Sequence, residues 1–305
     1  MHDQVPGLVW PDAVPDQLAH PLPGRVLVTG AGGSIGGDVV GLLQLYGTHV
    51  TALSSTWRRP SPADVVITGD ATDPDAVAAA LDGVEAVVHM AAIPGEGLAE
   101  PYPGYRTNTG ATFNVLSRAG ELGVHRCVLA SSINAFGVPA NHHQRLPAYY
   151  PIDEEIPRDL DDWYSLSKAS DELSAEMAAS HWGMTVIALR FPLTSLPSRV
   201  RELSRPHRHR QVREGWSYLD RRDAARAVLH ALTAPLTGAH VIGLSAVDTF
   251  REEDTESLLD AYAPHVPRRR SFLGRAALID TTRAEVRLGF RPRHTYDEPD
   301  PALID

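Results

Sequence analysis

The stretch from Arg25 to Gly37 constrains the fold more than any other part of this sequence. Arg25–Thr29 is rich in β-branched residues and predicts a short buried strand. The strand leads into three glycines, Gly30, Gly33 and Gly36, and apolar residues with helical spacing follow them. The first glycine permits a tight turn, the second lets a ligand approach the backbone, and the third lets the helix pack closely. Because the first-turn N–H groups of such a helix lack internal partners, we expect this stretch to bind the pyrophosphate of a dinucleotide.

Strands and helices alternate from residue 24 to residue 190. This rhythm predicts an α/β fold, with a doubly wound parallel sheet, helices on both faces and right-handed crossovers. The predicted strands are Val26–Thr29, His49–Leu53, Asp64–Thr68, Glu85–His89, Arg126–Ala130 and Thr185–Arg190, and the predicted helices are Gly33–Tyr46, Pro74–Leu81, Tyr105–Leu122 and Asp161–His181.

The alternation of strands and helices ends at Arg190, and we place a domain boundary there. Residues 24–190 form the expected dinucleotide-binding domain, residues 191–305 a small C-terminal substrate lobe, and the proline-rich residues 1–23 an N-terminal extension. We expect segments of the lobe to rejoin the main sheet. Its predicted elements are a helix within Tyr218–Ala234, a strand at Ala239–Leu244, and helices at Thr249–Tyr262 and Thr281–Leu288.

Composition excludes several classes of function. With 38 acidic and 28 basic residues the net charge is −10, which argues against nucleic acid as the main partner. No apolar run approaches the ~18 residues of a membrane span, and the N-terminus lacks the pattern of a secretory signal, so we expect a cytoplasmic protein that does not bind membranes. The single cysteine, Cys127, lies in a strand pattern and is predicted to be a core thiol. The histidines lack zinc-site spacing, so we expect no metal.

Tyr164 and Lys168 are the first candidates for chemistry. A spacing of four places both on one face of the predicted helix, one turn apart. Free tyrosine has a pKa near ~10, too high for a base at neutral pH. An ammonium about 4 Å away at an effective dielectric of ~20 is worth about 4 kcal/mol, or roughly three pKa units. Lys168, aided by a cationic nicotinamide, would therefore bring the Tyr164 phenol into the range of acid–base catalysis.

Two serines end the strand that begins at Arg126. Ser131 and Ser132 lie where the carboxyl edge of a parallel sheet binds ligands. A hydroxyl there would hold a substrate oxygen while Tyr164 moves the proton. Either serine could equally cap the end of the strand.

Together these features resemble the extended short-chain dehydrogenase/reductase superfamily, in its NAD-dependent epimerase/dehydratase group. The resemblance runs from Arg25 to about Pro292. It rests on Thr29-Gly-Ala-Gly-Gly-Ser-Ile-Gly36, Gly69-Asp70, His89-Met-Ala-Ala92, Asn108, Ser131-Ser132, Tyr164-x-x-x-Lys168, Arg190-Phe-Pro192, Tyr218-Leu-Asp-Arg-Arg-Asp-Ala-Ala-Arg226 and Asp280-Thr-Thr-Arg-Ala-Glu-Val-Arg-Leu-Gly-Phe-Arg-Pro292.

The resemblance implies a Rossmann fold and a role for each matching residue. Tyr164 would be the acid/base, Lys168 would bind the nicotinamide ribose, Ser132 would orient the substrate oxygen, and Asn108 would support the site from its helix. Asp70 and Ala71 would flank the adenine. The implied cofactor-binding set is Gly30, Gly33, Ser34, Ile35, Gly36, Ser54, Ser55, Arg58, Arg59, Asp70, Ala71, Met90, Ala91, Ala92, Tyr164, Lys168 and Phe191.

One departure from the family pattern concerns the cofactor. Family members that use NAD usually carry an acidic residue at the end of the second strand, where this chain has Ser54 and Ser55. No carboxylate repels a 2′-phosphate there, and Arg58 or Arg59 could pair with one. We therefore expect NADP to be preferred over NAD.

Other departures concern the substrate. Pro192 stands where nucleotide-sugar epimerases often carry asparagine, and Ser132-Ile-Asn134 lacks the Asp-Glu pair of the dehydratases. The chain instead resembles the compact uronate-dehydrogenase-like branch, in which an arginine of the lobe grips a carboxylate. Ser131, Asn134, Arg199 and Arg201 are the substrate-binding candidates on this interpretation.

The resemblance implies an oxidoreductase that transfers a hydride to or from a sugar, a sugar acid or a related hydroxy or carbonyl compound. An NAD(P)-dependent epimerase with transient oxidation is the first alternative, and a dinucleotide-binding redox sensor without catalysis is the second. The small-molecule substrate would be sugar-like or anionic. The family often pairs through the long helix after the fourth strand and the helix of Tyr164, which implies a homodimer.

Overall fold

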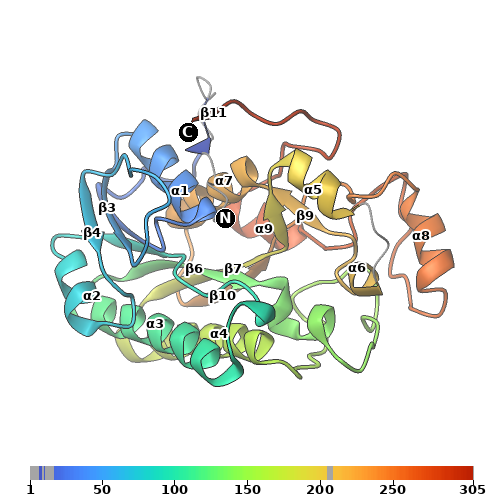
Figure 1. Ribbon diagram of the computed structural model, residues 1–305, viewed down its shortest axis with the longest axis horizontal. Helices are drawn as coiled ribbons and strands as arrows, with labels where there is room; N and C mark the ends of the chain where they lie inside the picture. Colours follow the sequence, from blue (N-terminus) through green and yellow to red (C-terminus); the bar gives the residue numbers. More distant parts are fainter. Residues whose placement is uncertain (1–6, 9, 11–16, 205–208, 305) are drawn as a thin grey trace.

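A parallel seven-stranded sheet forms the centre of the protein in the computed structural model, which describes residues 7–8, 10, 17–204 and 209–304 (Figure 1). The strand order is β10-β7-β6-β5-β2-β3-β4, and every neighbouring pair is parallel. The order steps outward in both directions from β2, which creates the crevice at the carboxyl edge where doubly wound sheets bind ligands. The strands are β2 (Arg25–Thr29), β3 (His49–Ser54), β4 (Val65–Thr68), β5 (Ala86–His89), β6 (Arg126–Ser132), β7 (Thr185–Phe191) and β10 (Ala239–Gly243).

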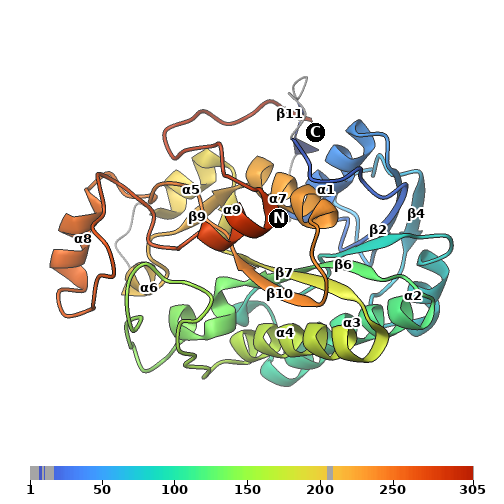
Figure 2. The ribbon, with the colours of Figure 1, turned by 180° about the vertical axis from the view of Figure 1, so that it is seen from behind.

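Helices cover both faces of this sheet (Figures 1 and 2). One face packs against α1 (Ser34–Leu45), α7 (Arg221–Thr233) and α9 (Thr282–Leu288), around a core that includes Val28, Val40 and Leu229. The other face packs against α2 (Pro74–Ala80), α3 (Pro101–Glu121) and α4 (Trp163–Trp182), whose core includes Cys127 and Leu129. None of the helices in the described ranges combines the length and hydropathy needed to cross a membrane.

The predicted doubly wound α/β class is confirmed, as is the return of the strand near residue 240 to the main sheet. Cys127 is a buried thiol, as predicted, and burial raises its pKa to about 12. Several predicted boundaries are wrong. α3 begins at Pro101 rather than Tyr105, because proline is well accommodated in a first helical turn. The helix predicted from Thr249 is α8 (Thr255–Tyr262), which begins six residues later, after an irregular segment.

A third apolar cluster, in the lobe, lies beyond the carboxyl edge of the sheet. Trp216, Tyr218 and Phe250 pack there with Ile133 and Tyr150, so the cluster also draws on the chain between β6 and α4. Its small elements were not predicted from the sequence. They are β8 (Leu193–Ser195), which pairs in parallel with β9 (Tyr218–Asp220), and the short helices α5 (Pro197–Ser204) and α6 (His209–Arg213).

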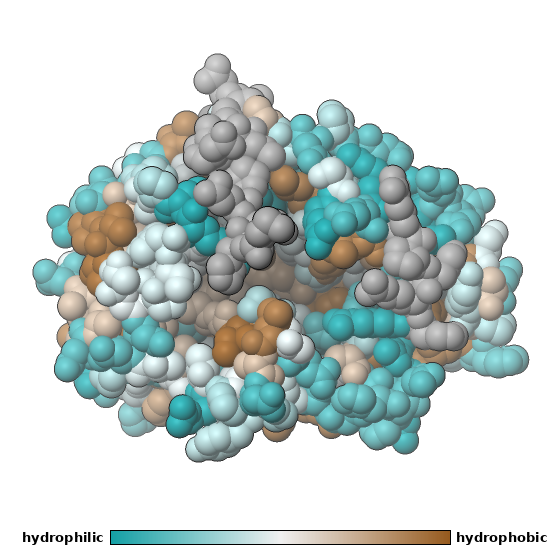
Figure 3. All heavy atoms as spheres, viewed as in Figure 1, coloured by the Kyte–Doolittle hydropathy of each residue, from teal (hydrophilic) through white to brown (hydrophobic). Residues whose placement is uncertain are grey.

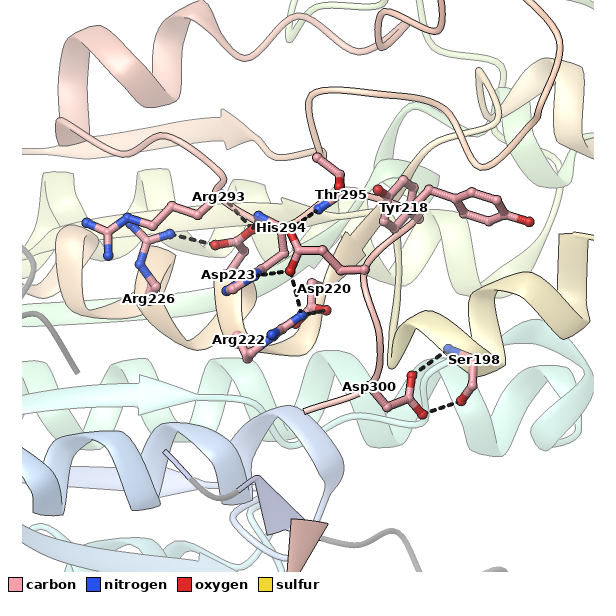
Figure 4. A network of polar contacts seen from close by, with 12 residues as sticks. Ser198, Tyr218, Asp220, Arg222, Asp223, Arg226, Arg293, His294, Thr295 and Asp300 are labelled. Carbon is pink, nitrogen blue, oxygen red and sulfur yellow. Dashed lines mark hydrogen bonds and ion pairs between the residues drawn. The ribbon is translucent and has the colours of Figure 1, made fainter. Parts of the chain in front are cut away.

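Hydrogen bonds hold the C-terminal segment against α7 and α5 (Figure 4). The buried Asp223 carboxylate of α7 accepts hydrogen bonds from the backbone N–H groups of Arg293 and His294, both at 2.9 Å. Farther along, Asp300 accepts from the backbone N–H of Ser198 at 2.7 Å and from its hydroxyl. The chain then ends in β11 (Leu303–Ile304), which pairs with β1 (Gly7–Leu8) beside α1. Most of the predicted N-terminal extension, and residues 205–208 of the basic run in the lobe, lie outside the described residues.

Candidate active site

A cavity of about 780 Å³ lies at the carboxyl edge of the sheet. Its wall runs from the glycine turn after β2, past the ends of β3, β5, β6 and β7, to α5 and α6 of the lobe. In the view of Figure 3, apolar surface is gathered in the hollow near the middle of the molecule, and polar side chains dominate the surrounding surface. Because one wall includes both the glycine turn and residues of α5 and α6, the cavity connects the predicted dinucleotide site with the lobe.

The backbone of the glycine turn packs so closely against neighbouring backbone that two of its positions exclude a side chain. Gly30 has a φ of 65°, and a Cβ there would lie 2.6 Å from the backbone N of Ala91. A Cβ at Gly36 would lie 2.3 Å from the Gly30 carbonyl oxygen. Gly33 is the N-cap of α1, has no side-chain cap, and lines the cavity. The first turn of α1 also lacks acidic residues, so its free N–H groups fit a pyrophosphate.

Polar groups without an acidic residue line the cavity at the end of β3. Ser54, Ser55 and the exposed Arg58 contribute to the wall, and Ser54 donates to the Thr56 carbonyl oxygen at 2.8 Å. Arg59 points elsewhere, because its Nη2 lies 3.7 Å from the buried Asp38 carboxylate of α1. The sequence offered Arg58 and Arg59 equally as partners of a 2′-phosphate. In the structure Arg58 lines the cavity and Arg59 faces Asp38 instead. Of the remaining predicted cofactor residues, the cavity wall includes Ser34, Ile35, Asp70, Ala71, Met90, Ala91, Ala92 and Phe191.

Tyr164 and Lys168 reach the cavity from the first two turns of α4. The Asp162 side chain caps this helix by accepting from the Ser165 N–H at 2.8 Å. Tyr164 is 8% exposed and Lys168 is 3% exposed, and both line the cavity. The Lys168 ammonium donates to the Ala130 carbonyl oxygen at 2.9 Å and to Asp171 Oδ2 at 3.1 Å. Burial alone would lower the pKa of Lys168, but the charges of Asp171 and Tyr164 raise it, so the ammonium is retained.

The two serines at the end of β6 have different surroundings. Ser131 donates to the buried Glu172 carboxylate at 2.7 Å, so its proton is not available to a ligand. Ser132 accepts from both the backbone N–H and the side-chain amide of Asn134, each at 3.1 Å. These two bonds occupy acceptor positions of the Ser132 oxygen and leave its proton free for a ligand. Asn134 Oδ1 is buried, has no partner among the described residues, and belongs to a side chain of the cavity wall.

Asn108 acts from behind the cavity. Its side-chain oxygen accepts from the Ile93 N–H at 2.8 Å, and its amide donates to the Ile93 carbonyl oxygen at 3.1 Å and to Ser167 at 3.2 Å. The side chain is fully buried and does not line the cavity. Asn108 therefore joins the segment after β5 to the helix that carries Tyr164.

The structure does not bring the two predicted carboxylate-binding arginines to the cavity. Arg199 pairs with Glu202 on α5, and Arg201 donates to the carbonyl oxygens of Tyr296 and Glu298 at 2.9 and 3.0 Å. Sequence reasoning missed the residues that do line the lobe end of the cavity, although Arg210 belongs to a basic run visible in the sequence. They are Leu193, Thr194, Leu203, Arg210, Gln211, Glu214 and Phe250.

The fold and this cavity define an α/β protein of the dinucleotide-binding class, with Tyr164 and Lys168 in the same cavity as the glycine turn. The family model described as "NAD dependent epimerase/dehydratase family" matches residues 26–243, and the chain belongs to that family. It is thereby an enzyme of the extended short-chain type, a group of NAD-dependent dehydrogenases and epimerases.

Two curated relatives agree with this assignment, and a solved structure shares the fold. The uronate dehydrogenase of Pseudomonas syringae is 28% identical over 222 residues, which cover 72% of this chain and 73% of that enzyme. The uronate dehydrogenase of Pseudomonas putida is 29% identical over 168 residues, which cover 54% of this chain and 59% of that enzyme. A short-chain dehydrogenase/reductase superfamily protein from Agrobacterium tumefaciens, solved with bound NAD, has a TM-score of 0.69 at 24% identity over 90% of this chain and 94% of that one.

Proposed function

We propose that the protein is an NAD(P)-dependent oxidoreductase that transfers a hydride between the nicotinamide and a carbon of a sugar or sugar acid. The observation that carries this proposal is that Tyr164, Lys168 and Ser132 share one cavity with the glycine turn. When bound, the cofactor supplies the hydride acceptor or donor. The match to uronate dehydrogenases over 72% of the chain supports the sugar-acid class.

In this proposal each residue acts on one substrate oxygen. Ser132 donates its free proton to that oxygen and holds it near the Tyr164 hydroxyl. Tyr164 takes the proton of a substrate hydroxyl during oxidation, or returns it during reduction. Lys168 stabilises the phenolate through its positive charge, and its low exposure of 3% keeps that charge from being screened by water. The Tyr164–Lys168 pair and the hydride-carrying ring thus act on opposite ends of one carbon–oxygen bond.

Arg210 takes the place of Arg199 and Arg201 as the proposed partner of a substrate carboxylate. It lines the lobe end of the cavity together with the uncharged polar side chains of Thr194 and Gln211. Arg210 also pairs with Glu214, whose pKa is raised by burial, with the Arg210 charge opposing the shift. A guanidinium can bind a carboxylate in bidentate fashion, and neighbouring hydroxyl and amide groups suit a polyhydroxylated chain.

The proposed cofactor preference remains NADP over NAD. Arg58 supports it, because its exposed side chain lines the cavity where Ser54 and Ser55 replace an acidic residue. Comparison of the two dissociation constants is the test, and equal or tighter binding of NAD contradicts this part of the proposal.

A panel of uronic acids, aldoses and their lactones, assayed with NAD and NADP, tests the proposed reaction. Net oxidation produces reduced nicotinamide in a one-to-one ratio with product. An epimerase, which has the same Tyr164–Lys168 requirement, converts the substrate with no lasting change in nicotinamide absorbance. Tight cofactor binding without turnover of any sugar supports the sensor alternative and contradicts the proposal.

We also propose a homodimer that pairs through α3 and α4. These adjacent helices carry apolar side chains on the outside, with Phe113 52%, Leu166 45% and Leu173 55% exposed. Light scattering at micromolar concentration should give twice the chain mass, and Phe113→Asp together with Leu173→Asp should return it to one chain mass. A single chain mass for the unaltered protein contradicts the dimer. The cytoplasmic location stays a prediction.

A further inference from the structure

A carboxylate lies directly behind the Tyr164–Lys168 pair. Asp171 Oδ2 accepts from the Lys168 ammonium at 3.1 Å, and both side chains are almost fully buried, at 1% and 4% exposed. The other carboxylate oxygen of Asp171 has no hydrogen-bond partner among the described residues. The ammonium that acts on Tyr164 is therefore shared with a buried carboxylate, whose pKa is raised by burial, with the Lys168 charge opposing the shift.

The other ionisable groups around this pair are already accounted for. Glu172, the next residue of α4, is engaged by Arg190 at 2.8 and 2.9 Å and by Arg158 at 3.0 Å. Its charge is thus largely compensated before it can act on Lys168.

On the opposite side, His89 of β5 is held between the hydroxyls of Thr29 at 2.7 Å and Thr112 at 3.2 Å. Burial, with the Lys168 charge, lowers the pKa of His89 to about 3, so this ring is neutral. Among the described residues, Asp171 is consequently the carboxylate beside Lys168 that pairs with the ammonium itself and that no arginine engages.

We propose that Asp171 is a positioning residue that sets the working pH of the Tyr164–Lys168 pair. Its negative charge opposes the loss of a proton from either member of the pair, and its oxygen fixes the direction of the ammonium. The proposal rests on the proposed function only in assigning Tyr164 the acid–base role. Because the pair is coupled, its two apparent pKa values belong to the pair, and both fall when a nearby negative charge is removed.

The test is Asp171→Asn, which keeps the size of the side chain and an oxygen that can accept from Lys168. Asp171 Oδ2 lies 3.1 Å from the Lys168 ammonium, and at an effective dielectric of 20 to 40 one charge at that distance corresponds to roughly two to four pH units. Both limbs of the pH–rate profile should therefore move to lower pH, by at least about one unit, in either direction of the reaction. Glu176→Gln removes a charge from an exposed position of the same helix and should leave the profile in place.

A second measurement needs no turnover. Lys168 is expected to contact the nicotinamide ribose, so binding of reduced nicotinamide cofactor should weaken at high pH as the ammonium is lost. Asp171→Asn should move this loss of binding to lower pH by at least about one unit, as read from the fluorescence of the bound cofactor. Asp171→Ser, with a smaller uncharged side chain, gives the same comparison where the asparagine variant does not fold.

The outcomes separate the two proposals. A shifted binding profile with no turnover of any sugar supports the role of Asp171 and contradicts the proposed reaction. A folded, active Asp171→Asn protein with unmoved pH limbs, or with limbs moved to higher pH, overturns the role of Asp171 even if the proposed reaction is demonstrated.

Discussion

Substitution of Arg58 by alanine should weaken NADP binding selectively. Arg58 lines the cavity at the end of β3, and no hydrogen bond or ion pair within the described part of the chain engages it. Its guanidinium is therefore available to a 2′-phosphate. For an exposed pair about 4 Å apart, the interaction is worth between ~1 kcal/mol in water and ~4 kcal/mol at a dielectric of 20. Because Arg58 is exposed, we take about 1 to 2 kcal/mol, which is a 5- to 30-fold increase in the Kd for NADP.

The assay is a fluorescence titration with NADPH and NADH at two salt concentrations. NADH lacks the 2′-phosphate, so its Kd should change by less than about twofold, and the NADPH effect should shrink at high salt as the charges are screened. Arg59→Ala is the matched control. Its guanidinium faces Asp38 rather than the cavity, so its loss should not alter the ratio of the two Kd values. Equal weakening of both cofactors by Arg58→Ala would refute the reasoning.

Three further predictions concern stability. Asp38→Ala should lower the free energy of unfolding by about 3 to 5 kcal/mol in denaturant titrations, because the buried Arg221, held at 2.7 Å by both carboxylate oxygens, loses this partner; a loss below 1 kcal/mol contradicts this. Asn108→Ala should cost about 2 to 3 kcal/mol and reduce kcat, because both backbone groups of Ile93 lose a partner; unchanged stability and kcat contradict this. Burial would raise the pKa of Glu298, but hydrogen bonds hold it below its ordinary value, so its stabilisation is present above about pH 4.5 and is lost as the pH falls through the folded pKa. Glu298→Gln should therefore be less stable than the parent protein at pH 6 and nearly equal to it at pH 3, and a difference that does not change with pH contradicts this.

The parts of the fold that sequence predicts well are those in which local pattern and packing agree. The glycine turn at Gly30 is one, since its positive φ of 65° and lack of room for a Cβ are both properties of that single position. The pair of Tyr164 and Lys168 is another, because helical spacing alone brings them to one face. Their shared exposure to the cavity follows from the position of α4 at the carboxyl edge of the sheet.

Side-chain direction at the end of β6 shows what sequence left open. Placement at the strand end did not distinguish Ser131 from Ser132, and only the family resemblance assigned the substrate oxygen to Ser132. The structure distinguishes them because successive residues of a strand point to opposite faces. Ser131 consequently reaches Glu172 between β6 and α4, whereas Ser132 turns to the cavity and is polarised by Asn134. Asn134 lies only two residues from Ser132, but Glu172, the partner of Ser131, lies 41 residues away, so no local pattern could show that Ser131 is engaged.

The lobe was the least predictable region for a related reason. β8, α5 and α6 are short, and their conformations depend on packing around Trp216 and on a C-terminal segment about a hundred residues away. Arg201 illustrates the effect, because carbonyl groups at Tyr296 and Glu298 draw it away from the cavity. Residue type alone made it as good a ligand for a carboxylate as Arg210.

The central claim, that the Tyr164 phenol moves the substrate proton beside a bound nicotinamide, is tested most directly by Tyr164→Phe. Removal of one hydroxyl from a side chain that is 8% exposed should leave the fold and the Kd for reduced cofactor nearly unchanged. The steady-state kcat on the best substrate should fall by about 10²- to 10⁴-fold, the range for loss of a general acid–base group. A kcat within a factor of about three of the parent protein, with the cofactor still bound, would contradict the account.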